Sequence, residues 1–118
     1  MKMRAFESGA VAELQAAAGH MEREHNMELA GKERFEMDDL MEIIRLLRRP
    51  VGGCPWDSVQ THQSIRMNFL EETCEVLEAI DLADSTLLCE ELGDILMQVA
   101  LHTAMEEEQG RFTLEDVC

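Results

Sequence analysis

The chain has 118 residues, which suits a single domain and leaves no room for a second. Its 25 Asp and Glu residues outnumber its 10 Lys and Arg residues, and the formal net charge of −15 argues against nucleic acid polymers and anionic membranes as partners. At 46% apolar and 4% aromatic, the sequence is too apolar for a disordered acidic tail and favours an all-α fold over a β fold.

No segment has the properties of a secretory signal or of a membrane span. The first twenty residues lack an apolar core, and no apolar run approaches the roughly 18 residues that cross a bilayer. We therefore expect a cytoplasmic location. In that reducing compartment the cysteines, which form no CxxC pair, are predicted to be small buried thiols. They are Cys54, Cys74, Cys89 and Cys118.

The first 36 residues carry the weakest pattern. Helical spacing predicts a helix near 9–30 through Val11, Leu14, Ala18 and Met21. We interpret residues 1–36 as an N-terminal helical arm for packing or oligomerisation, and residues 37–118 as the domain that carries the chemistry.

The next predicted helix spans about 37–48. Its apolar face consists of Leu40, Ile43, Ile44 and Leu47. Acidic residues in the first turn and arginines in the last turn complement the helix dipole. Pro50 and two glycines end it, and residues 51–60 form a loop that holds Trp56, the only tryptophan.

Two longer helices are predicted at about 64–82 and 86–109, and the short link between them makes an antiparallel hairpin. Gly110 ends the second helix, and Thr113 begins a capping box that starts a further helix. Because the helix at 86–109 is apolar on nearly every side, we expect a four-helix-bundle-type core completed by oligomerisation.

Both helices of this hairpin carry acidic residues at helical spacing. On the first helix they are Glu71, Glu72, Glu75 and Glu78. Alone, this pattern also fits the solvated surface of an acidic protein. On the second helix, Glu91 and Asp94 share one face among apolar residues, where burial is costly without a countercharge. No Lys or Arg occurs between Arg66 and Arg111, so a bound cation is the remaining countercharge.

The spacing of these acidic residues matches across the link. Position 83 is the midpoint both of Glu75 and Glu91 and of Glu72 and Asp94. At about 1.5 Å per residue, the first pair lies about 12 Å from the turn and the second about 16 Å. The four carboxylates can therefore converge between the helices, and an oxygen-only set suits Mg²⁺ or Mn²⁺.

The spaced acidic motif resembles the EExxE…ExxD signature of the MazG-type all-α nucleoside triphosphate pyrophosphohydrolases. The segment GGCPWDSVQTHQSIR at 52–66 is similar to the GCPWDxxQTHxSL segment of the MazG subgroup. LEETCEVLEAID, EELGDILMQVALH and GRFTLEDV continue the match, which covers about residues 37–117.

This resemblance implies a Mg²⁺-dependent hydrolase that cuts nucleoside triphosphates between the α and β phosphates, giving the monophosphate and pyrophosphate. By motif position the metal ligands would be Glu72, Glu75, Glu91 and Asp94. Glu71 would be an auxiliary ligand or help to orient water. The family further implies a homodimer or a higher homo-oligomer.

The sequence also departs from the family pattern. MazG domains continue past FTLEDV into a helix with basic residues and a histidine, whereas this sequence ends at Cys118. Phosphate binding would then rely on the metal, on a partner subunit or on arginines such as Arg66. Two alternatives to a house-cleaning enzyme follow: a more specialised nucleotide pyrophosphatase, and a truncated, non-catalytic metal-binding dimerisation module.

Other polar and aromatic residues are candidates for substrate binding. Trp56 could stack on a base or form a hydrophobic lid. His62 could contact substrate or only cap a helix, and Asn68 lies one turn before Glu72. His102 is predicted to be a partly buried structural histidine.

Overall fold

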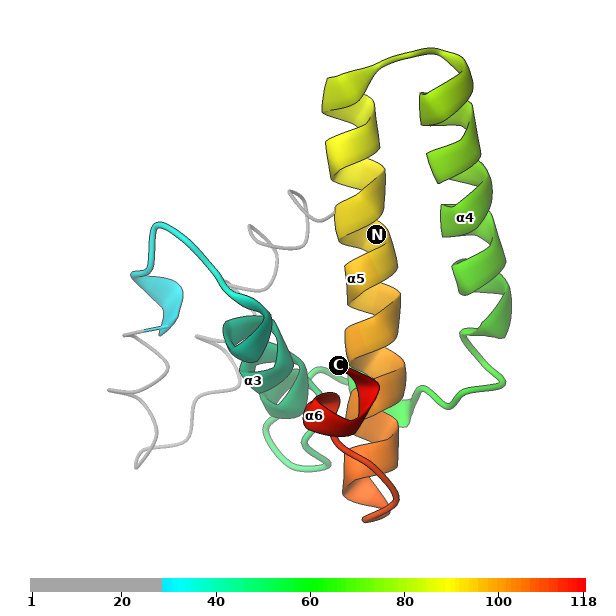
Figure 1. Cartoon of the computed structure of the whole chain (residues 1–118). Helices are drawn as coiled ribbons and strands as arrows, with labels where there is room; N and C mark the ends of the chain where they lie inside the picture. Colours follow the sequence, from blue (N-terminus) through cyan, green and yellow to red (C-terminus); the bar gives the residue numbers. More distant parts are fainter. Residues whose placement is uncertain (1–28) are drawn as a thin grey trace. The chain divides into compact units, whose positions relative to one another are not determined.

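The computed structural model describes residues 29–118, and all regular structure in this range is helical. The helices are α3 (Met37–Leu47), α4 (Arg66–Asp81), α5 (Ser85–Glu108) and α6 (Leu114–Val117), with a 3₁₀ turn η1 at Asp57–Val59 (Figure 1). The all-α prediction is confirmed. The predicted helix near 9–30 lies almost entirely outside the described residues.

The described residues divide into two compact units, 29–60 and 61–118. In the first unit, α3 begins with a capping box in which Asp39 Oδ2 accepts from the Glu36 backbone N–H at 2.8 Å. Its apolar face is buried, with Leu40, Ile44 and Leu47 at most 2% exposed. This matches the pattern predicted for residues 37–48.

The loop after α3 folds back tightly onto the end of that helix. Arg48 is buried, and its Nη1 donates to the carbonyls of Asp57 at 2.8 Å and Gln60 at 2.9 Å. Gly53 lies so close to the α3 terminus that an added Cβ would be 2.3 Å from the Arg49 carbonyl oxygen. Residues 52–60, which belong to the segment that resembles the MazG subgroup, therefore form a well-packed loop with a defined conformation.

In the second unit, α4 and α5 form the predicted antiparallel hairpin (Figure 1). The connecting residue Ala83 has a φ of 52°, and Asp84 caps α5 by accepting from the Leu87 backbone N–H at 3.0 Å. Thr113 and Asp116 form the capping box predicted to start α6. Both long helices lie within two residues of their predicted bounds.

The hairpin leaves part of its apolar surface exposed. In α4 the exposed apolar residues lie at helical spacing on one side, and in α5 they are confined to its first half. They are Met67, Leu70, Leu77, Ile80, Leu92 and Leu96, which we call the apolar stripe. The second half of α5 is buried on most sides, with Met97, Ala100, Leu101 and Ala104 at most 2% exposed.

The prediction of buried cysteines is wrong. Cys74, Cys89 and Cys118 are exposed and Cys54 is half-buried, all as free thiols. Cys74 and Cys89 occupy the exposed side of their helices, at helical spacing from stripe residues such as Leu77 and Leu92. The small apolar side chain of a cysteine does not by itself indicate which side of a helix is buried. No helix within residues 29–118 is long and apolar enough to cross a membrane.

Candidate metal centre

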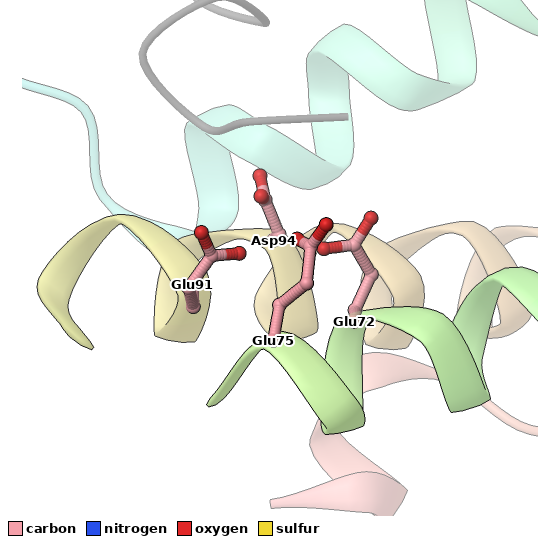
Figure 2. A group of neighbouring side chains, drawn as sticks. All are labelled: Glu72, Glu75, Glu91 and Asp94. Carbon is pink, nitrogen blue, oxygen red and sulfur yellow. The ribbon is translucent and has the colours of Figure 1, made fainter. Parts of the chain in front are cut away.

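Four carboxylates meet between α4 and α5. Glu72 and Glu75 come from α4, Glu91 and Asp94 come from α5, and each offers one oxygen within 4.8 Å of those of the other three (Figure 2). We call this group the carboxylate cluster. The antiparallel hairpin thus brings together the two pairs that are equidistant from its link.

The carboxylate cluster lies in a buried environment. Asp94 is 0% exposed, Glu91 1% and Glu72 7%, and Glu75 is half-buried. Removing ionised carboxylates from water costs several kcal/mol each unless other charges or hydrogen bonds compensate. The stretch from Met67 to Gly110 contains 12 Asp or Glu side chains and no Lys or Arg, so a cation from outside the hairpin suits this position.

The donor set fits a divalent cation that prefers oxygen. Octahedral Mg²⁺ with ligands at about 2.1 Å places its ligand oxygens about 3 to 4.2 Å apart, and Ca²⁺ allows slightly more. The 4.8 Å limit of the carboxylate cluster therefore needs only small side-chain rotations to close around one ion. With no Cys or His among the four, the set suits Mg²⁺ or Mn²⁺ better than Zn²⁺ or copper.

The remaining predicted residues lie at different places. Glu71 is exposed on α4 beside Glu72, and it is not a member of the carboxylate cluster. Arg66 is the exposed first residue of α4, and Asn68 is half-buried one turn before Glu72. Trp56 belongs to the other compact unit, where it is 50% exposed in the loop between α3 and η1.

His62 lies in a polar chain with residues of α5 and its C-terminal turn. Its Nδ1 is 2.6 Å from His102 Nδ1, and its Nε2 is 2.6 Å from Glu106 Oε1. Arg111 donates to both oxygens of Glu106, from Nε at 2.6 Å and from Nη2 at 2.8 Å. Both ring nitrogens of His62 are therefore engaged inside the protein.

The surroundings of Glu106 and His102 shift the pKa values of both groups. Hydrogen bonds from Arg111 and then His62 lower the pKa of Glu106 to about 2. Burial, reinforced by the neighbouring His62, lowers the pKa of His102 below its usual value. His102 is half-buried, as predicted, but its pairing with His62 was not predicted, since 40 residues separate the two and no local pattern pairs them.

The loop of the first unit holds a second buried acid. Asp57 is 2% exposed, and burial raises its pKa, opposed by a hydrogen bond with Cys54 and by the charge of Arg48. Burial also raises the pKa of the Cys54 thiol, which makes it a poor nucleophile. Neither residue adds a ligand to the carboxylate cluster, whose four members all belong to the second unit.

Comparison with known proteins identifies the family. Residues 60–118, half of the chain, match the family described as the MazG nucleotide pyrophosphohydrolase domain. The chain belongs to the MazG family. The matched segment contains both helices of the hairpin and the whole carboxylate cluster.

The sequences of several known proteins align with about two thirds of this chain. The chain is similar to an uncharacterized protein, YabN, of Bacillus subtilis, with 51% identity over 70% of this chain. It is also similar to the nucleoside triphosphate pyrophosphohydrolase/pyrophosphatase MazG of Thermotoga maritima (45% over 68%) and the nucleoside triphosphate pyrophosphohydrolase of Escherichia coli K12 (47% over 70%). The aligned segment spans 17%, 31% and 32% of these relatives, respectively. No solved structure matches the chain significantly.

Proposed function

We propose that this MazG chain hydrolyses nucleoside triphosphates between the α and β phosphates, yielding a nucleoside monophosphate and pyrophosphate, with Mg²⁺ as the cofactor. The observation that carries the proposal is the convergence of Glu72, Glu75, Glu91 and Asp94 within 4.8 Å. Two relatives that align with this chain are named for nucleoside triphosphate pyrophosphohydrolysis, which supports the substrate class.

The carboxylate cluster would hold the ion. When bound, Mg²⁺ would activate a water and stabilise the charge that develops on the phosphoryl oxygens. Glu72, Glu75, Glu91 and Asp94 would hold the ion between α4 and α5, whose antiparallel pairing already brings the four carboxylates together. The exposed Glu71, adjacent to Glu72, orients the attacking water in this proposal.

Substrate contacts are proposed for residues near the N-terminus of α4 and in the motif loop. Arg66, as an exposed cation, would bind phosphate oxygens, and Asn68 would hydrogen-bond the nucleotide. The half-exposed ring of Trp56 would stack on the base. His62 was also predicted to contact substrate, and its hydrogen bonds to His102 and Glu106 favour another role, developed below.

We further propose that the protein is a homodimer or a larger homo-oligomer. The apolar stripe exposes about half of each of six side chains on α4 and α5, from 47% at Leu96 to 56% at Leu77. Burying such a surface is favourable by about 25 cal/mol per Å². A second copy offers an apolar stripe of the same kind, and two hairpins then form a four-helix bundle. Sedimentation of a stable folded monomer at micromolar concentration would contradict this.

A substrate panel tests the proposed activity. The purified chain is incubated with each common ribo- and deoxynucleoside triphosphate and Mg²⁺, and the products are separated. The proposal predicts monophosphate and pyrophosphate in equal amounts. Release of nucleoside diphosphate and inorganic phosphate would show that a different bond is cut and would contradict the proposal. Metal binding without turnover of any nucleotide would instead support the non-catalytic dimerisation module.

A further inference from the structure

The His62 and His102 rings meet edge to edge. Their planes differ by 2°, and their centroids are 4.9 Å apart, while the two Nδ1 atoms are only 2.6 Å apart. Parallel rings stacked face over face would be separated by about 3.5 Å or more, so this contact requires the rings to lie nearly in one plane. In that plane an Nδ1–H of one ring points at the lone pair of the other, which is the geometry of a hydrogen bond.

The hydrogen bonds of His62 limit the number of protons that can lie between the two Nδ1 atoms. Glu106 accepts two hydrogen bonds from Arg111, and its Oε1 also lies against His62 Nε2, so Nε2 carries a hydrogen. A single proton can then lie between the two Nδ1 atoms, on either ring. If both rings were cationic, two N–H groups would face each other at 2.6 Å and the contact would break.

The pair lies at the open end of the hairpin. His62 comes four residues before α4, and His102 lies in the second half of α5, eight residues or about 12 Å beyond Asp94. At the other end, the link at Ala83 joins the two helices covalently. The carboxylate cluster lies between these two ties, so the relative position of Glu72 and Asp94 depends on both.

We propose that His62, His102 and Glu106 form a one-proton clamp that positions α4 against α5 and thereby holds the carboxylate cluster ready for its metal. The role in metal binding rests on the proposed function. His62 and His102 are positioning residues, because they act on the ion only through the carboxylates.

The clamp makes the affinity for the ion sensitive to pH. Within residues 61–118, the charged groups that face the pair are Glu106 and Arg111, and α4 contributes the apolar ring of Phe69. Acidification toward the double cation opens the clamp.

Mn²⁺ alone is the probe for the test, in the whole chain at pH 7.5 and pH 5.5. His102→Leu removes the hydrogen bond, whereas His102→Asn keeps an amide near the Nδ1 position and does not titrate. Thr103→Val is the matched control, since it removes the neighbouring hydroxyl that donates to the Val99 carbonyl within α5. Circular dichroism establishes that each variant is folded before its Mn²⁺ affinity is measured by calorimetry.

We expect His102→Leu to bind Mn²⁺ at least about tenfold more weakly than wild type at pH 7.5, the size of effect typical of residues that orient metal ligands. His102→Asn and Thr103→Val stay within about twofold of wild type. At pH 5.5 wild type loses affinity and His102→Asn loses much less. Three results would each overturn the clamp. The first is that His102→Leu binds Mn²⁺ as tightly as wild type, and the second is that His102→Asn binds it as weakly as His102→Leu. The third is that wild type and His102→Asn lose the same affinity at pH 5.5.

A second readout separates the clamp from the metal site. Without metal, hydrogen exchange of residues 61–66 should be slow in wild type and His102→Asn and at least severalfold faster in His102→Leu. Equal exchange rates would overturn the clamp. If wild type binds no Mn²⁺ while this exchange pattern holds, the proposed function fails and the positioning of α4 by the pair stands.

Discussion

The acidic side chains in the two halves of α5 have opposite electrostatic surroundings. In the first half, Glu91 and Asp94 are at most 1% exposed and converge with two further carboxylates. In the second half, about 18 Å further along the helix from Asp94, Glu106 accepts hydrogen bonds from Arg111 and contacts His62. The charged partner of Glu106 lies five residues further along the chain, whereas four like charges come together in the carboxylate cluster. Such a group of buried carboxylates could hold a metal ion.

The largest expected effect is on catalysis. Glu91→Gln and Asp94→Asn preserve side-chain shape but remove one charge and one strong ligand, so metal-dependent hydrolysis should fall to background in each variant. The measurement is pyrophosphate release with Mg²⁺. Glu78→Gln is the control, because Glu78 is exposed on α4 outside the carboxylate cluster and should retain activity. Full activity of Glu91→Gln, or loss of activity in Glu78→Gln, would contradict the assignment.

The same chemical change should have opposite effects on stability at the two positions. Without metal, Glu91→Gln should leave the melting temperature unchanged or raise it, since it relieves repulsion and charge burial. Glu106→Gln should lower it, because Arg111 and His62 lose their charged acceptor. Thermal unfolding in a chelating buffer checks both. A lower melting temperature for Glu91→Gln than for Glu106→Gln would remove the distinction between the two halves.

A glycine substitution probes how Arg111 reaches Glu106. Gly110 ends α5 with a φ of +67°, and the turn returns Arg111 so that its backbone N–H donates to the Glu106 carbonyl at 3.1 Å. Gly110→Ala should cost about 1 kcal/mol of unfolding free energy, because an L residue is strained at this φ and not because of a clash. Urea denaturation measures it. An unchanged midpoint would show that the turn does not constrain this end of the helix.

The pH dependence of stability gives the smallest expected difference. The pKa of Glu106 is lowered to about 2 from an ordinary value of 4.5. The unfolded chain therefore takes up the proton first on acidification, so the stabilisation is complete above pH 4.5 and is lost as the pH falls from 4.5 toward 2. Comparing wild type with Glu106→Gln across this range should show a steeper decline in wild type. Parallel declines would indicate that Glu106 is not coupled to Arg111 and His62.

Much of the hairpin could be predicted from the sequence because its determinants are local. Asp84 and the short link fix an antiparallel turn, and equal spacing from that link brings Glu72 to Asp94 and Glu75 to Glu91. These relations need only the rise per residue of a helix.

The rest depends on contacts that periodicity does not encode. His62 and Glu106 are 44 residues apart, and nothing in either local sequence indicates the pairing. Arg48 was predicted as one of several dipole-complementing arginines, yet it is buried and donates to the carbonyls of the motif loop. The exposed cysteines were missed for a related reason: hydrophobicity predicts burial on average, whereas the apolar stripe of one chain is left uncovered.

Calorimetric titration of Mg²⁺, with Mn²⁺ as a second ion, into wild type, Asp94→Asn and Glu78→Gln tests the central claim most directly, namely that the carboxylate cluster is a metal site. We predict saturable binding in wild type and Glu78→Gln, and its loss in Asp94→Asn. The bound ion should raise the free energy of unfolding of wild type by about 2.7 kcal/mol at one hundred times its dissociation constant. Absence of binding in wild type, or equal binding in wild type and Asp94→Asn, would contradict the account.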